Sequence, residues 1–114
     1  MSQQKNRRHL TEEALSLIAG RFKALSEPTR LKLIIALEEG EKNVTALMDE
    51  VGTTQTNTSR HLQHLTDCGI LGRRKAGLNV YYFISDPSIF ELCEHVCGSL
   101  EKRLESQQKA LKSD

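Results

Sequence analysis

The chain has 114 residues, of which only 38% are hydrophobic, and it contains no tryptophan. It therefore suits one domain with a modest aliphatic core that gains stability by pairing with a second copy. The formal net charge of +1 at pH 7 excludes a polycation that holds nucleic acid by bulk charge alone, and no apolar run approaches the about 18 residues of a membrane span.

The cysteine content and the N-terminal sequence predict a compartment. Three cysteines are an odd number, whereas the disulfide frameworks of small secreted domains use even numbers. The stretch Met1–His9 is polar and lacks the apolar core of a signal peptide. We therefore expect reduced thiols and a cytoplasmic protein.

Charge is spread unevenly along the chain. Between Thr54 and Val80 there are four Arg and Lys residues against one Asp, a balance of +3, whereas the segment from Glu38 to Glu50 is acidic. A local basic patch on a nearly neutral protein is typical of a protein that must leave its polyanion on demand.

One domain is expected over residues 11–109, between a disordered N-terminal tail at 1–10 and a flexible C-terminal tail at 110–114. Thr11 is a good N-cap for the first helix, and apolar residues follow it at helical spacing. Pro28 breaks this helix and suits the first turn of the next one.

Two short helices come next. Asn43 is a plausible cap for the first of them, Gly52 makes a tight turn, and Thr53 or Thr54 opens a second helix that runs to about Asp67. The second helix exposes side chains able to hydrogen-bond bases or phosphates, namely Gln55, Thr56, Asn57, Ser59, Arg60, Gln63 and His64. That polar face favours a helix-turn-helix over a simple helical hairpin.

The rest of the domain reads as a β-hairpin and a final helix. Residues 69–75 and 80–84 are rich in strand-forming residues and flank a turn at Ala76-Gly77. Beside a helix-turn-helix, such a hairpin is a wing that grips the DNA backbone. The last helix begins at Asp86-Pro87 and continues to about Lys109. The fold class predicted is mainly α with a two-stranded β-hairpin, a winged helix-turn-helix.

This order of elements resembles the ArsR/SmtB family of dimeric bacterial repressors. The matching segments are Phe22–Leu31 (FKALSEPTRL), Thr54–Leu65 (TQTNTSRHLQHL), Cys68–Leu71 (CGIL) and Arg73–Tyr82 (RRKAGLNVYY). The likeness covers roughly residues 12–104. It implies a homodimer formed through the first and last helices, and repression by binding a near-palindromic operator in double-stranded DNA, with half-sites about one helical turn apart.

The candidate DNA contacts lie on the recognition helix and the wing: Thr54, Gln55, Thr56, Asn57, Ser59, Arg60, His61, Arg73, Arg74 and Lys75. Residues at the start of a recognition helix approach base edges, and Gln binds adenine through two hydrogen bonds. Three alternatives stay open. Thr54 acts only as a helix cap, His61 packs beneath the helix, or the three wing cations are ordinary solvated charges.

Cys93 and Cys97 are candidate ligands of a soft, thiol-binding effector. They stand four residues apart and so share one helix face, with Cβ atoms about 6 Å apart, too far for an unstrained disulfide. Trivalent arsenic or antimony spans such a pair, with Cys68, a partner-chain thiol or, last in rank, His95 as third ligand. The alternative is that all three cysteines are core residues.

Two patterns of the family are missing. The segment Val44–Glu50 lacks the Cys-Val-Cys arsenic motif, and a lone His95 does not complete the zinc-type site of the last helix. The effector is thus left open: trivalent arsenic or antimony at the last helix is favoured, with oxidants or reactive sulfur, or no effector at all, as alternatives.

Two other classes of protein compete with this interpretation. An enzyme is disfavoured, because no glycine-rich phosphate loop, metal-hydrolase spacing or catalytic triad is found. A winged-helix module that binds protein rather than DNA is the stronger competitor. The two differ in salt dependence, because DNA binding weakens steeply as salt rises.

Overall fold

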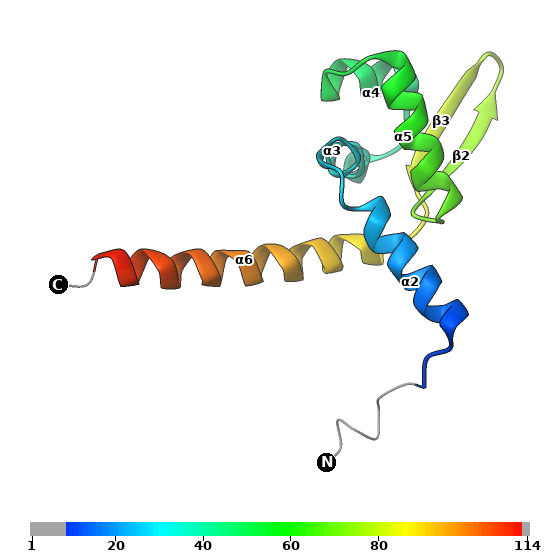
Figure 1. Ribbon diagram of the computed structural model, residues 1–114. Coiled ribbons are helices and arrows are strands. Elements are labelled where there is room, and N and C mark those ends of the chain that lie inside the picture. The colour runs from blue at the N-terminus through cyan, green and yellow to red at the C-terminus, as the bar shows by residue number, and fades with distance from the viewer. Residues whose placement is uncertain (1–8, 113–114) are drawn as a thin grey trace.

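The computed structural model describes residues 9–112. Most of the expected N-terminal tail (1–8) and the end of the expected C-terminal tail (113–114) lie outside the described residues. The elements in chain order are α2 (Glu12–Ala24), α3 (Pro28–Ala36), a 3₁₀ turn (Leu37–Glu39), β1 (Lys42–Asn43), α4 (Val44–Val51), α5 (Gln55–Asp67), β2 (Leu71–Ala76), β3 (Asn79–Ile84) and α6 (Ser88–Lys112). Figure 1 shows α4 and α5 beside the β2–β3 hairpin, with α2 and α6 below them. The predicted fold class is confirmed.

Side chains cap three of the helices, each at a residue singled out from the sequence. The Thr11 hydroxyl accepts a hydrogen bond from the Ala14 amide (3.0 Å), and Asn43 Oδ1 accepts one from Ala46 (2.9 Å). Thr54 Oγ1 accepts one from the Asn57 amide at 3.2 Å. Each bond satisfies an amide that the first turn of a helix leaves unpaired.

Gly52 makes the turn between α4 and α5. Its φ of 76° is in the left-handed region, where side chains other than glycine are strained. Its amide also donates to Met48 O at 2.8 Å, which closes α4. The turn between α4 and α5 therefore takes only residues 52–54, and the predicted helix-turn-helix is confirmed.

The wing differs from its prediction in two details. The strands β2 and β3 pair antiparallel, with Ala76 opposite Asn79, so the turn residues are Gly77-Leu78 rather than Ala76-Gly77. A third strand, β1, pairs with β3 on its other side, giving the order β1-β3-β2. A strand of two residues shows no alternation of apolar and polar residues, so the sequence did not reveal it.

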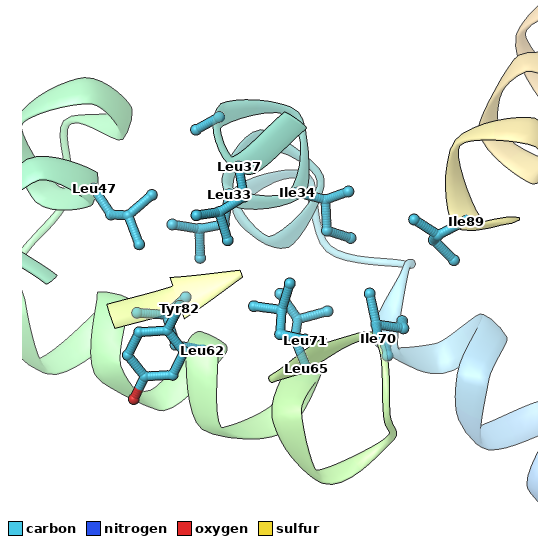
Figure 2. Close-up of a cluster of buried hydrophobic side chains, with 12 residues drawn as sticks. Leu33, Ile34, Leu37, Leu47, Leu62, Leu65, Ile70, Leu71, Tyr82 and Ile89 are labelled. Atoms are coloured by element: carbon cyan, nitrogen blue, oxygen red, sulfur yellow. The ribbon is translucent and has the colours of Figure 1, made fainter. Parts of the chain in front are cut away.

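The core lies where α3, α4, α5, the hairpin and the start of α6 meet (Figure 2). Its largest members are Leu33, Ile34, Leu37, Leu47, Leu62, Leu65, Ile70, Leu71, Tyr82 and Ile89. On α3, Leu33 is fully buried whereas Ile35 is 64% exposed. Ile89 is the only buried residue of α6 among those described, so one turn anchors the whole helix to this core.

The last helix projects away from the rest of the chain (Figure 1). It continues to Lys112, three residues beyond the expected end at Lys109. Helices α2 and α6 leave a set of large apolar side chains exposed, namely Leu15, Leu17, Ile18, Phe22, Val96, Leu100, Leu104 and Leu111. None of the helices between residues 9 and 112 is long and apolar enough to cross a membrane.

Candidate nucleic-acid interface

Helix α5 has two opposite faces. Thr58, His61, Leu62 and Leu65 recur at intervals of three and four residues and are buried, which fixes that face against the core. The opposite face carries Gln55, Thr56, Ser59, Arg60 and Gln63, all exposed, and we call these five residues the recognition stripe. Their side chains offer amide, hydroxyl and guanidinium groups, the groups that read base edges in the major groove.

The first turn of α5 combines capping with exposure. Thr54 itself serves as the cap, and its backbone oxygen also accepts from the Thr58 hydroxyl at 2.7 Å. Gln55 and Thr56 are left free at the surface. The positive end of the helix dipole and the unpaired amides there attract a phosphate, while the two side chains face outward.

Arg60 lies one turn further along the stripe. Its Nη2 donates to Asn57 Oδ1 at 2.9 Å, which steadies the guanidinium without neutralising its charge. Among residues 9–112, no carboxylate lies within ion-pair distance of Arg60. Arg60 therefore keeps a charged fork available for a base or a phosphate.

His61 does not belong to this surface. It is only 5% exposed, and its Nδ1 accepts a hydrogen bond from Arg30 Nη1 at 3.2 Å. Burial, and then the positive charges of Arg60 and Arg30, hold the pKa of His61 below its ordinary value. The expectation of a DNA contact at His61 is therefore corrected, since its position on the apolar face of α5 turns it toward α3.

The three wing cations differ in their surroundings. Arg74 donates from Nε to Glu41 Oε2 at 2.8 Å and forms a second hydrogen bond to Oε1. Its guanidinium also lies over the Tyr81 ring, 4.9 Å from the centroid. Arg73 and Lys75 are exposed and form no ion pair with any described residue. Two of the three predicted cations are thus available for phosphate.

Neither the Glu41–Arg74 pair nor the Arg30–His61 pair was predicted from the sequence. Arg30 lies in the segment FKALSEPTRL that carried the family resemblance, which was the only signal for it. Nothing in the sequence links Glu41 to Arg74, because the pair depends on how β1 brings the acidic segment beside the wing.

The cysteines do not form a three-ligand cluster. Cys93 is half-buried and Cys97 is exposed on α6, whereas Cys68 ends α5, with its thiol directed at Leu65 O at 3.4 Å. Across residues 9–112 no group of three or more Cys, His, Asp or Glu side chains is placed to hold a metal ion. Cys68 thus does not lie in a preformed three-ligand group with Cys93 and Cys97 among these residues.

Comparison with known proteins places this geometry in a family. The sequence profile of the bacterial regulatory proteins of the arsR family matches residues 27–72, which span α3, the helix-turn-helix and the start of the wing. The antimony-specific transcriptional repressor AntR is 30% identical, with a TM-score of 0.74 over 92% of this chain and 96% of that one. The chain belongs to the ArsR family of bacterial regulatory proteins.

Two further proteins are similar to this chain. The homodimeric winged helix-turn-helix DNA-binding domain of a Mycobacterium bovis protein is 28% identical, with a TM-score of 0.74 over 89% of this chain and 94% of that one. A probable mercury resistance operon repressor of Streptomyces lividans is 37% identical over 71 residues. That match covers 62% of this chain but only 57% of the relative. The names of these relatives describe regulators of transcription and not enzymes, which agrees with the predicted class.

Proposed function

We propose that this ArsR protein is a homodimeric repressor that binds a near-palindromic operator through the recognition stripe and the wing. The observation that carries the proposal is that α5 has one buried and one exposed face. The buried face packs on the core, so Arg60, which has no carboxylate partner among the described residues, and its polar neighbours point to solvent. Exposed Arg73 and Lys75 flank this stripe and supply phosphate contacts that orient the protein on the duplex.

The proposed dimer interface lies on α2 and α6. Isolated protomers rarely expose so many large apolar side chains, and Leu100 and Leu104 lie on a part of α6 that projects beyond the core. Covering these apolar side chains with a second copy removes apolar area from water at about 25 cal/mol per Å². The homodimeric state of the Mycobacterium bovis neighbour supports this arrangement.

A twofold dimer presents two copies of α5 to the same side of DNA. The half-sites are then related by the same twofold axis and lie about one helical turn apart. Blocking a promoter in this way is repression. Because promoter DNA and reduced thiols share the cytoplasm, we place the protein there, in agreement with three free cysteines.

We propose further that Cys93 and Cys97 bind a thiophilic effector that releases the operator. The two thiols occupy successive turns of α6, within the proposed interface, so ligation there changes how the two protomers pack. The recognition helices then no longer match successive grooves. The antimony specificity of AntR supports trivalent antimony or arsenic as the effector.

The coordination number divides the candidate ions. Trivalent arsenic or antimony takes three ligands, and a thiol of the partner protomer is the favoured third one, because Cys68 and His95 form no preformed group with the pair. Mercury(II), the ion named for the Streptomyces lividans relative, is satisfied by two thiolates. Mercury(II) is the second candidate. The two kinds of ion differ in the number of protein ligands that each bound ion needs, three for arsenic or antimony and two for mercury.

Oxidant or reactive-sulfur sensing is less well supported. A redox-sensing cysteine needs a lowered pKa, because the thiolate is the reacting form. The Glu101 carboxylate, which accepts a hydrogen bond from Cys97 Sγ at 3.5 Å, raises the pKa of this thiol instead. A metal ion displaces the thiol proton directly, so the same arrangement permits metal binding with release of protons.

The test is fluorescence anisotropy of the reduced protein on a labelled duplex from the region upstream of its coding sequence. Trivalent antimony, trivalent arsenic, mercury(II) and peroxide are titrated in separate arms. The matched control is the double variant Cys93→Ser/Cys97→Ser, with Cys68→Ser beside it. Release by a metal or metalloid from wild type and Cys68→Ser, but not from the double variant, supports the proposal. Release from all three proteins, or from none, contradicts the assignment to Cys93 and Cys97.

A further inference from the structure

Arg30 is a buried cation without a carboxylate partner. It is only 9% exposed, and no described Asp or Glu lies within ion-pair distance of its guanidinium. Burying a charge in this way is costly unless every donor finds an acceptor. Its position therefore needs an explanation in the contacts that it makes.

The guanidinium joins the end of α2 to the recognition helix. Arg30 Nε donates to Ala24 O at 2.6 Å and Nη2 donates to Lys23 O at 3.1 Å, so two donors close the C-terminal turn of α2. The negative end of the helix dipole stabilises a cation at that place. The remaining edge of the fork donates from Nη1 to His61 Nδ1 at 3.2 Å.

His61 is suited to this contact only as a neutral ring. A guanidinium only donates, so Nδ1 must accept and the proton of the neutral ring is on Nε2. The lowered pKa of His61 agrees with this form. The neighbouring residue Arg60 stands on the recognition stripe, so a rotation of α5 about its axis moves Arg60 and the Arg30–His61 bond together.

We propose that Arg30 and His61 are positioning residues, which set the orientation of α5 against the end of α2 and so determine sequence-specific DNA binding. This inference rests on the proposed function. Thr58, Leu62 and Leu65 already fill the space beneath α5, but apolar packing alone does not fix the rotation of a helix. The planar guanidinium of Arg30, hydrogen-bonded to three acceptors, is directional and does fix it. Because α2 also belongs to the proposed dimer interface, this bond relates each recognition helix to the axis of the dimer.

The experiment compares operator affinity with affinity for a scrambled duplex of the same length at one salt concentration. His61→Leu keeps the apolar volume and removes the acceptor, and His61→Asn restores an acceptor near the place of Nδ1. Arg30→Lys keeps the charge without the planar fork. Unfolding midpoints and sedimentation of each variant confirm a folded dimer at the assay temperature.

We expect His61→Leu and Arg30→Lys to lose about tenfold or more in operator affinity, while their affinity for the scrambled duplex changes by about twofold or less. His61→Asn recovers most of the loss. The double variant Arg30→Lys/His61→Leu should bind the operator no more weakly than the more affected of the two single variants, because both substitutions remove the Arg30–His61 hydrogen bond. If His61→Leu does not fold, Arg30→Lys and His61→Asn provide the same comparison.

Two results overturn the inference. One is operator affinity within about twofold of wild type in both His61→Leu and Arg30→Lys, and the other is an equal loss on both duplexes, which is the mark of general destabilisation. A wild-type protein that does not discriminate between the duplexes contradicts the proposed function itself. Discrimination that survives in the variants contradicts only the positioning role.

Discussion

Glu41 and Arg74 are paired through two hydrogen bonds that join the segment before β1 to the wing. The hydrogen bonds from Arg74 lower the pKa of Glu41, and those same bonds raise the pKa of Arg74. The pair neutralises one of the three adjacent wing cations and aligns its guanidinium over Tyr81. Arg73 and Lys75, two residues apart on β2, are therefore the wing cations that no carboxylate compensates among the described residues.

Arg73→Ala should weaken binding to every duplex by a similar factor and reduce the slope of log affinity against log salt by about 1, because one phosphate contact is lost. Arg74→Ala should reduce that slope by less than half as much, since Glu41 already compensates its charge. The measurement is anisotropy across a salt series. Equal slopes for the two variants would contradict the assignment.

Leu100→Glu should convert the dimer into monomers. Leu100 is exposed on the projecting part of α6, and a carboxylate there must be desolvated for the second copy to pack, which weakens association about tenfold or more. Sedimentation velocity at micromolar concentration measures the change. The matched control is Leu78→Glu at the wing tip, a fully exposed position outside the proposed interface, which should leave the dimer unchanged.

Gly72→Ala should destabilise the fold by about 1–3 kcal/mol. A Cβ at Gly72 would lie 2.5 Å from the Phe83 ring, its cross-strand neighbour. Urea unfolding of four proteins gives the test, with Phe83→Leu as the second substitution. If the cost of Gly72→Ala is as large in the Phe83→Leu background as in wild type, the close contact is not its cause.

His61 should make stability depend on pH in the weakly acidic range. Because its pKa is lowered in the folded protein, the unfolded chain binds more protons below the ordinary histidine pKa of about 6.5. The contribution of neutral His61 to the free energy of unfolding is fully present above that pH, and it is lost as the pH falls toward the pKa of His61 in the folded state. The free energy of unfolding should therefore fall more between pH 7 and 5 for wild type than for His61→Asn. Parallel curves would show that protonation of His61 is not coupled to unfolding.

Local features of the fold were predictable from the sequence because they depend on neighbouring residues. Thr11, Asn43 and Thr54 cap helices through amides three residues away, and Gly52 satisfies a backbone angle that few other residues adopt. The five residues of the recognition stripe are among the seven whose exposure was predicted from helical periodicity, whereas His64, also predicted, is half-buried.

Features that depend on distant residues were not predictable. The strand β1 forms only because β3 offers a free edge, and Ile35 is exposed because the face of α3 is set by what packs against it. His61 stood between two interpretations until the position of Arg30, 31 residues earlier in the chain, decided for packing. Whether Cys68 lies beside Cys93 and Cys97 was likewise open in the sequence, because it depends on the direction of α6 relative to the end of α5.

Sequence-specific DNA binding by α5 is the central claim, and Arg60→Ala tests it most directly. Anisotropy is measured for wild type and Arg60→Ala on the upstream duplex and on a scrambled duplex, across a salt series, with Lys32→Ala as the control of equal charge change. We predict that wild type prefers the upstream duplex and binds more weakly as salt rises. Arg60→Ala should lose about 1–3 kcal/mol of that preference while staying dimeric, and Lys32→Ala should keep it. Unchanged preference in Arg60→Ala, or wild-type binding that does not respond to salt, would contradict the account.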